Sequence, residues 1–254
     1  MTNFYLTFKN GKILKDLVDI CKDVVGDINL EITESGIAMQ AMDMSHVCLV
    51  TFFIDKQEFD EYNIDKTVVL SLSLKSLNLI LKCYKEGYKL SLSYTEKDVL
   101  QIIFYCGDVE NDTDQQYTWN LVLMDIDTEK LCIPDEDYDV EIKMDANEFS
   151  TIMKNVGTLG QSLKIQTIGK LLNLQVSGDI GNVEVSKSLN KQKMHSKCNL
   201  ELSFAMRYIL LFIKGSNLTQ NLIMKLRKEQ PLELKYQISD YSFIQFFLAP
   251  KIDD

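Results

Sequence analysis

Short stretches in which apolar and polar residues alternate run along most of the chain. This two-residue period is typical of β-strands with one buried face. The amino-terminal stretch up to Lys9 alternates in the same way. The clearest strands are predicted over residues 29–33, 47–52, 89–94, 100–104, 171–176 and 232–238. The protein is therefore predicted to be dominated by strands.

Four segments have apolar residues at three- and four-residue spacing instead, which predicts amphipathic helices. They are predicted over about 12–25, over about 74–84, from Asp145 through Val156, and from Ser203 to Gly215. The Asp145 carboxylate is placed to cap the third helix, with Glu148 at the capping-box position. Gly215 is predicted to end the fourth helix as a left-handed cap.

Two helices precede residue 90 and two follow residue 145, each pair embedded in strands, so the halves look like two copies of one α+β plan. We predict an amino-terminal domain over residues 1–122 and a carboxyl-terminal domain over 139–254. Between them, residues 123–138 are acidic, include Pro134 and have two apolar side chains, Leu131 and Ile133. Such a composition is typical of an extended connector.

The bulk composition excludes several classes of protein. Of 254 residues, 46% are hydrophobic and 25% charged, and no apolar run reaches the length of a membrane span. The first residues lack the features of a signal peptide, so an intracellular location is expected. The 6 cysteines have no paired spacing and there are only 2 histidines, so we expect no disulfide, no metal site and no cofactor.

The charge is unevenly distributed. The net charge of -10 argues against a surface that grips nucleic acid everywhere, and Arg207 and Arg227 are the only arginines. Any DNA contact is therefore expected to be independent of sequence, because few side chains can read guanine edges. On three predicted helices, however, the centre of the polar face contains basic or neutral residues and no acids. This pattern fits either an ordinary solvated helix face or a surface that faces DNA.

The carboxyl terminus is unusually apolar. A predicted strand continues directly into Leu248-Ala-Pro-Lys-Ile252. Pro250 has no amide hydrogen to give to a sheet, so residues 249–252 are expected on the surface with apolar groups uncovered. Such a segment is typical of a binding surface for a partner.

Four motifs stand out along the chain: residues 37–50 (IAMQAMDMSHVCLV), 80–83 (ILKC), 131–134 (LCIP) and 248–252 (LAPKI). Together they resemble the proliferating cell nuclear antigen family of sliding clamps. The resemblance covers nearly the whole chain, in the right order and at nearly the right spacing. It implies two clamp domains per chain and a homotrimeric ring of six domains, with helices lining the hole and sheets outside. Such a ring encircles duplex DNA in the nucleus and tethers polymerase, a clamp loader and other replication and repair proteins.

The resemblance also implies which residues do each task. The basic residues facing the hole are Lys15, Lys22, Lys82, Lys154, Arg207 and Lys214, to which helix geometry adds Lys75 and Lys85. The groove for clamp-interacting peptides is formed by Met42, His46, Val47, Leu49, Leu131, Ile133, Pro134, Pro231, Phe247, Ala249, Pro250 and Ile252. Asp43, beside the groove, corresponds to a family position that supports docking and loading.

Ring closure requires strands of neighbouring chains to pair at their edges. One edge is expected in the segment before the connector, with Tyr117, Trp119 and Leu121. The other is expected in the strand after Ser177-Gly178, with Val183 and Val185. Ordinary core packing is the alternative interpretation of these side chains.

The chain departs from the family pattern at several positions. Gly169 stands where a lysine that accepts ubiquitin-type modification is common, with Lys170 next to it. Asp16, Leu79 and Thr151 replace expected bases, so the hole should be less positive than usual. The insert at residues 107–116 is acidic and longer than expected.

Enzymatic and ion-binding functions are only weakly supported. Asp43, Ser45 and His46 suggest a hydrolase, but neighbours on a strand point to opposite faces. Asp125 and Asp127 could bind a divalent ion, although an acidic linker explains them, and residues 157–160 lack the lysine of a phosphate loop. No enzyme is therefore predicted. The remaining alternative is a subunit of a mixed, checkpoint-type clamp.

Overall fold

The structure is a computed structural model that describes residues 3–95, 98–107, 115–126, 138–189, 194–196 and 198–251. The chain divides into two compact units. The first comprises Met1–Ala41 and Thr51–Leu131, and the second comprises Met42–Val50 and Cys132–Asp254. The boundaries of the predicted connector at 123–138 stay a prediction, because most of it lies outside the described residues.

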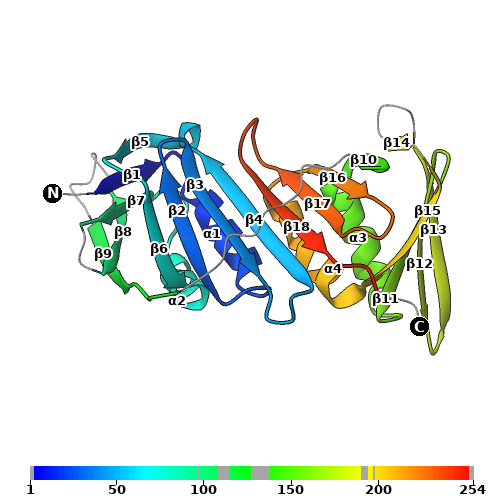
Figure 1. The fold of residues 1–254 in the computed structure, drawn as a ribbon. Coiled ribbons are helices and arrows are strands. Elements are labelled where there is room, and N and C mark those ends of the chain that lie inside the picture. Colours follow the sequence, from blue (N-terminus) through cyan, green and yellow to red (C-terminus); the bar gives the residue numbers. More distant parts are fainter. Residues whose placement is uncertain are drawn as a thin grey trace. The chain divides into compact units, whose positions relative to one another are not determined.

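The first unit contains two α-helices, α1 (Lys12–Cys21) and α2 (Leu74–Leu81), and a short 3-10 helix, η1 (Lys56–Glu58). The strands that lie wholly or mostly in it are β1 (Phe4–Phe8), β2 (Asp27–Thr33), β3 (Gly36–Met42), β4 (Cys48–Asp55), β5 (Phe59–Ile64), β6 (Val68–Ser73), β7 (Lys89–Tyr94), β8 (Val99–Cys106) and β9 (Gln115–Val122). The end of β3 and the start of β4 belong to the second unit. One sheet has the order β5-β1-β7-β8-β9, and β4-β3-β2-β6 are neighbours in another. The two helices pack against each other on one side of β2 and β6 (Figure 1).

The second unit repeats this plan. Its helices are α3 (Ala146–Val156) and α4 (Met206–Phe212), the latter continued by a 3-10 helix, η2 (Ile213–Asn217). Its strands are β10 (Val140–Asp145), β11 (Ser162–Ile168), β12 (Leu171–Gly178), β13 (Gly181–Ser188), β14 (Met194–Ser196), β15 (Leu200–Ala205), β16 (Asn221–Leu226), β17 (Leu232–Gln237) and β18 (Phe243–Leu248). Strands β14-β10-β16-β17-β18 are neighbours in that order, and β13-β12-β11-β15 form a separate sheet. The strand-rich α+β prediction with two similar halves is thus confirmed.

The helices form where the apolar period predicted them. Ile13, Leu14, Leu17 and Val18 are the buried face of α1. The helix ends at Cys21 and not at Val25, because the amides of Val24 and Val25 both turn back to the Cys21 carbonyl at 2.9 Å. The predicted cap of α3 is confirmed, since an Asp145 Oδ1 accepts the Glu148 amide at 2.8 Å.

Aromatic side chains centre the core of each unit. In the first unit the Phe8 and Phe59 ring centroids lie 4.3 Å apart. In the second, Phe212 stacks on Phe246 at 4.4 Å, and the edge of Tyr236 meets Phe246 at 6.2 Å. These contacts fix α4 against strands β17 and β18.

The predicted left-handed cap at Gly215 is wrong. Gly215 lies inside η2, is buried and has no positive φ. A Cβ at this position would lie 2.6 Å from the ring of Tyr236, which is itself fully buried. Glycine is therefore required by the close approach of an aromatic ring and not by backbone handedness.

We expect Gly215→Ala to destabilise the second unit by about 1 to 3 kcal/mol, as overpacking of a rigid core does. Urea unfolding would measure this change in the free energy of unfolding. Gly26→Ala is the matched control, because a Cβ there has nothing within 4 Å. Equal unfolding midpoints for the two variants would show that the Tyr236 ring moves aside for the added methyl group at little cost in free energy.

Candidate functional site

The turn between β3 and β4, residues 43–47, is built around the Asp43 carboxylate. Its Oδ1 accepts the amides of Cys48 at 2.7 Å and Val47 at 2.8 Å, and its Oδ2 accepts the amide of Ser45 at 3.2 Å. His46 in this turn has a φ of 56°. One buried carboxylate thus fixes the shape of a loop that includes two predicted groove residues, His46 and Val47.

A fourth hydrogen bond ties this turn to helix α4. The Tyr208 hydroxyl donates to Asp43 Oδ2 at 2.6 Å, and both side chains are buried. Burial disfavours the charged carboxylate. The hydrogen bonds from Tyr208 and the three amides outweigh it, so the pKa of Asp43 lies below its ordinary value. Burial, and then the bond to Asp43, raise the pKa of Tyr208, which therefore stays a donor.

These contacts revise the argument against a hydrolase. Asp43, Ser45 and His46 do not lie on a strand, as the sequence argument assumed, but in a turn. Because backbone amides and Tyr208 surround Asp43, its carboxylate serves to hold the turn.

Close packing explains the two glycines of residues 157–160, the segment that was compared with a phosphate loop. A Cβ at Gly157 would lie 2.7 Å from Leu210 Cδ2, and a Cβ at Gly160 would lie 2.1 Å from the Ser177 carbonyl oxygen.

The carboxyl-terminal segment joins the same turn. The Ala249 amide donates to the Val47 carbonyl at 3.0 Å, and the Lys251 amide donates to the Ser203 carbonyl at 2.7 Å. Leu49 and Phe247 are buried, whereas Ala249 and Pro250 are half-buried. The structure thus brings together predicted groove residues that are about 200 positions apart in sequence. Met42 and Pro231 are also half-buried in this unit, whereas Leu131, Ile133, Pro134 and Ile252 lie outside the described residues.

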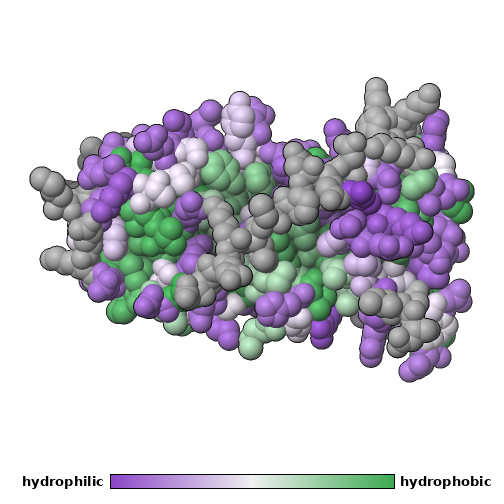
Figure 2. Space-filling view, in the orientation of Figure 1, coloured by the Kyte–Doolittle hydropathy of each residue, from purple (hydrophilic) through white to green (hydrophobic). Residues whose placement is uncertain are grey.

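Sequence reasoning missed three residues here. Tyr208 is buried, and nothing in the helical pattern marked its bond to Asp43. Met44 is 98% exposed at the tip of the turn, an unusual place for a large apolar side chain. Lys251 and Arg207 border an open hollow of about 500 Å³. Apolar side chains also gather on the face of the first unit over β6 (Figure 2), where Val69 is 56% exposed.

The predicted DNA-facing residues are of two kinds. Lys75, Lys82, Lys85, Lys154 and Arg207 are exposed, and no carboxylate among the described residues lies within ion-pair distance of them. Lys15, Lys22 and Lys214 are half-buried. The Lys15 ammonium donates to the Tyr84 carbonyl at 2.9 Å.

Lys22 differs from the exposed bases, because Asp19 in α1 and Asp23 just after this helix neutralise its charge. Its ammonium lies 2.7 Å from Asp19 and 3.2 Å from Asp23. Burial lowers the pKa of Lys22, but the bonds to the two aspartates outweigh it and the pKa is raised. The Lys22 ammonium is therefore held in ion pairs with both aspartates. Lys12 and Asp16 form another at 2.5 Å.

The predicted subunit residues lie on the two edge strands β9 and β13. On β9, Trp119 pairs with Ile102 and Leu121 with Leu100, so Trp119 and Leu121 share the core face of their sheet. On β13, Val185 pairs with Leu174 and Val183 with Val176, again on the core face. Trp119 and Tyr117 are exposed, and Val183 and Val185 are half-buried. Each hydrophobic layer therefore reaches an open sheet edge.

Neither a metal site nor a membrane span is present in the part of the chain that the structure describes. That part contains no group of three or more His, Cys, Asp and Glu side chains that could hold a metal ion. Asp125 is exposed, and Asp127 lies outside the described residues. None of the helices in the described ranges has the length and apolar character that a membrane-spanning helix requires.

Family models match both halves of the chain. Residues 3–130 match the N-terminal domain of proliferating cell nuclear antigen, and residues 132–251 match its C-terminal domain. The chain belongs to the proliferating cell nuclear antigen family. The proliferating cell nuclear antigen of Caenorhabditis elegans is 34% identical over 259 residues, covering 99% of this chain and 98% of the relative. That of Chaetomium thermophilum is 34% identical over 255 residues, covering 97% of each chain.

Membership in the proliferating cell nuclear antigen family confirms the predicted function. The chain is a DNA sliding clamp, which forms a homotrimer on DNA and binds polymerases and other proteins. The family consists of scaffolds without enzymatic activity, so the hydrolase alternative is rejected. The mixed checkpoint-type ring is disfavoured, because both relatives are proliferating cell nuclear antigens over nearly their full length.

Proposed function

We propose that this clamp acts in the nucleus, where β9 of one copy pairs with β13 of the next to close the ring. The proposal rests on one observation: the apolar core face of each sheet extends as far as its edge strand, β9 in one sheet and β13 in the other. Pairing would join Trp119 and Tyr117 to Val183 and Val185 in one continuous hydrophobic layer. The nuclear location rests on the relatives, which are nuclear antigens of eukaryotes by name. Microscopy of the tagged chain in dividing cells tests it.

We assign the hole to the exposed basic residues Lys75, Lys82, Lys85, Lys154 and Arg207, with smaller roles for Lys15, Lys22 and Lys214. A closed ring stays on DNA because it encloses the duplex, so few weak phosphate contacts suffice. An acidic outer surface of the ring is then compatible with DNA binding in the hole. The ring loaded on a closed plasmid should slide off after the plasmid is cut at one site. Retention on the linear DNA would contradict enclosure.

We expect replacement of Lys85, Lys154 and Arg207 together by alanine to weaken DNA binding. The slope of log K against log salt should flatten by about 1 for each phosphate group that is no longer neutralised. Fluorescence anisotropy of a short duplex at several salt concentrations measures the slope, after light scattering has shown that the variant is still trimeric.

The matched control for this triple replacement is Lys22→Ala. Asp19 and Asp23 already neutralise Lys22, so its removal should change the slope far less than removal of an unpaired base. An equal effect per residue would contradict the distinction between paired and unpaired bases.

We assign partner binding to the turn at residues 43–47, the carboxyl-terminal residues Ala249 and Pro250, and the predicted groove residues around them. A short peptide that buries two or three apolar side chains there would gain about 1.5 to 3 kcal/mol from each before association costs. This range suits exchangeable, micromolar binding. Pro250→Ala should weaken a clamp-interacting peptide in calorimetry and leave the trimer mass and DNA binding unchanged.

A further inference from the structure

A buried carboxylate, that of Glu233, lies on strand β17 of the second unit. Glu233 is 2% exposed and stands between Leu232 and Leu234, which are fully buried. Successive side chains of a strand point to opposite faces, so Glu233 points away from the core that the two leucines fill. A glutamate is almost never fully buried unless it is paired. The partners of Glu233 therefore indicate what its carboxylate does.

Glu233 belongs to a row of side chains that crosses four neighbouring strands, β10-β16-β17-β18 (Figure 1). The register places Glu141 opposite Lys225, Lys225 opposite Glu233, and Glu233 opposite Phe247. Residues directly opposite on antiparallel strands share a face, and their Cβ atoms lie about 4.5 to 5.5 Å apart. Because Phe247 is a predicted wall of the partner groove, Glu233 is a direct neighbour of that groove.

The charge of Glu233 is balanced, but its hydrogen bonding is incomplete. The Lys225 ammonium lies 3.1 Å from Glu233 Oε1. This approach lacks the direction of a hydrogen bond, and Oε1 has no hydrogen-bond partner among the residues that the structure describes. A buried acceptor without a donor has lost its hydrogen bonds to water and gained none in return. The Oε1 atom therefore lacks a donor and not a counter-charge.

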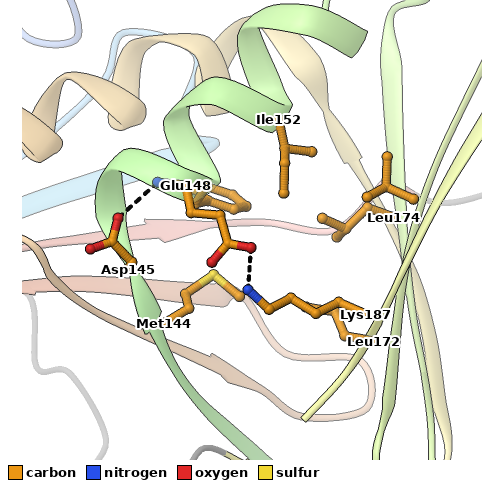
Figure 3. Close-up of a pocket in the computed structure, with 9 residues that line it drawn as sticks. Met144, Asp145, Glu148, Ile152, Leu172, Leu174 and Lys187 are labelled. Carbon is orange, nitrogen blue, oxygen red and sulfur yellow. Dashed lines mark hydrogen bonds and ion pairs between the residues drawn. The ribbon is translucent and has the colours of Figure 1, made fainter.

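Glu148 of the same unit shows the fully bonded arrangement. It lines a small apolar hollow between α3 and strands β12 and β13, and it forms a hydrogen-bonded ion pair with Lys187 (Figure 3). Asp145, also in this hollow, accepts the Glu148 amide at 2.8 Å. The accessible volume is about 10 Å³, the room of roughly one water molecule, so the hollow is too small for a ligand. Glu233, in contrast, has an ion pair without the hydrogen bond.

Two lysines decide which kind of donor Glu233 can accept. Burial, and then the positive charge of Lys225, lower the pKa of Lys235, although Glu233 acts in the opposite direction. A further cation beside Glu233 would therefore be repelled by both lysines. A neutral O–H or N–H group meets no such repulsion, and its hydrogen bond to a carboxylate is stronger than one between neutral groups. The surroundings of Glu233 thus favour a neutral donor.

We propose that Glu233 makes the partner groove select peptides whose apolar plug contains an aromatic residue with a neutral donor, a tyrosine in place of a phenylalanine. The ring packs on Phe247, and the hydroxyl donates to Glu233 Oε1. Phe247 is itself only 8% exposed, so a plug that reaches it must part the groove wall, and this movement opens the way to Glu233. The inference rests on the proposed partner groove and adds a side chain that sets its specificity.

Calorimetry with two synthetic peptides tests this selection on the full-length trimer. The peptides have the same clamp-interacting sequence and differ only in one plug residue, tyrosine or phenylalanine. The unaltered protein should bind the tyrosine peptide about tenfold more tightly. Glu233→Leu has no acceptor and should bring the two affinities to within about twofold of each other. Because both peptides are compared on the same variant, a general change in groove shape affects both and cancels in the ratio.

Glu141→Leu is the matched control, because Glu141 also lies opposite Lys225 but on the side away from Phe247. It should keep the tenfold ratio, and Glu233→Gln, which keeps an acceptor without the charge, should give an intermediate ratio. Equal affinities of both peptides for the unaltered chain would overturn the inference, and so would a tenfold ratio that survives Glu233→Leu.

A third peptide, with lysine at the same plug position, separates a neutral donor from a cation. It should bind more weakly than the tyrosine peptide, and tighter binding would overturn the inference in favour of a cation site. Pro250→Ala tests the groove independently, since it should weaken the tyrosine and phenylalanine peptides alike. Unchanged binding of both peptides to Pro250→Ala would mean that the proposed groove itself is wrong.

Discussion

Replacing Trp119 by alanine should convert the ring into single chains at micromolar concentration. Trp119 lies at the open edge of its sheet, on the core face beside Leu121, and is 37% exposed in the isolated chain. An aromatic anchor that becomes buried at an interface is typically a hot spot, and its truncation costs about 2 to 4 kcal/mol. The dissociation constant of each interface should therefore rise about 30- to 1000-fold.

Light scattering or sedimentation over a dilution series measures this change, with loading on circular DNA as the functional readout. Tyr241→Ala is the control, because Tyr241 is 58% exposed but lies outside the edge strands. The Trp119→Ala variant should stay folded with a somewhat lower unfolding midpoint, because the indole is only 37% exposed in the isolated chain and already packs on its own sheet. A trimer that resists dilution as well as the unaltered protein would refute the role of Trp119.

The alternating pattern predicted the sheets because one face of each strand is buried. Strand β7 has the predicted bounds, Lys89–Tyr94, and the strand predicted over 171–176 lies within β12. The helices were also recognisable, because their apolar period reflects packing on the sheets. Local order that depends on burial of one face is therefore readable from sequence.

Features that depend on distant partners were not readable. Gly215 was misinterpreted because the reason for a glycine is the ring of Tyr236, which lies in a later strand. The resemblance placed Lys22 among the basic residues that face the hole, but it did not reveal that Asp19 and Asp23 neutralise this lysine. Tyr208 was missed because its partner, Asp43, is 165 positions away. Sequence spacing describes a face of an element, but the contacts made by that face are set by the fold.

The bond between Tyr208 and Asp43 leads to the second large effect. Asp43→Asn should weaken binding of a clamp-interacting peptide at least about tenfold. The buried carboxylate accepts three backbone amides and one hydroxyl, whereas an asparagine amide nitrogen only donates. Some of these amides would be left without an acceptor, at about 1 to 3 kcal/mol each. Calorimetry with the peptide measures the change in affinity, and Asp240→Asn, an exposed aspartate, is the control.

Tyr208→Phe should have a smaller effect of the same kind, because it removes one donor to a charged group, worth about 1.5 to 3 kcal/mol. If the turn at residues 43–47 acts as a unit, the double variant Asp43→Asn, Tyr208→Phe should be less impaired than the sum of the single variants. Strict additivity would show that Tyr208 and Asp43 act independently.

The pH dependence separates this mechanism from simple loss of packing. The pKa of Asp43 is lowered in the folded chain, so its contribution is complete above the ordinary aspartate pKa of about 4. The contribution disappears only as the pH falls through the lower, folded-state pKa. Peptide affinity should therefore stay constant from neutral pH down to about 5. In Tyr208→Phe the burial penalty remains while one stabilising bond is gone, so the pKa of Asp43 rises and the decline should begin at higher pH. A phenylalanine variant with weaker binding but an unshifted pH profile would mean that Tyr208 only packs against the turn.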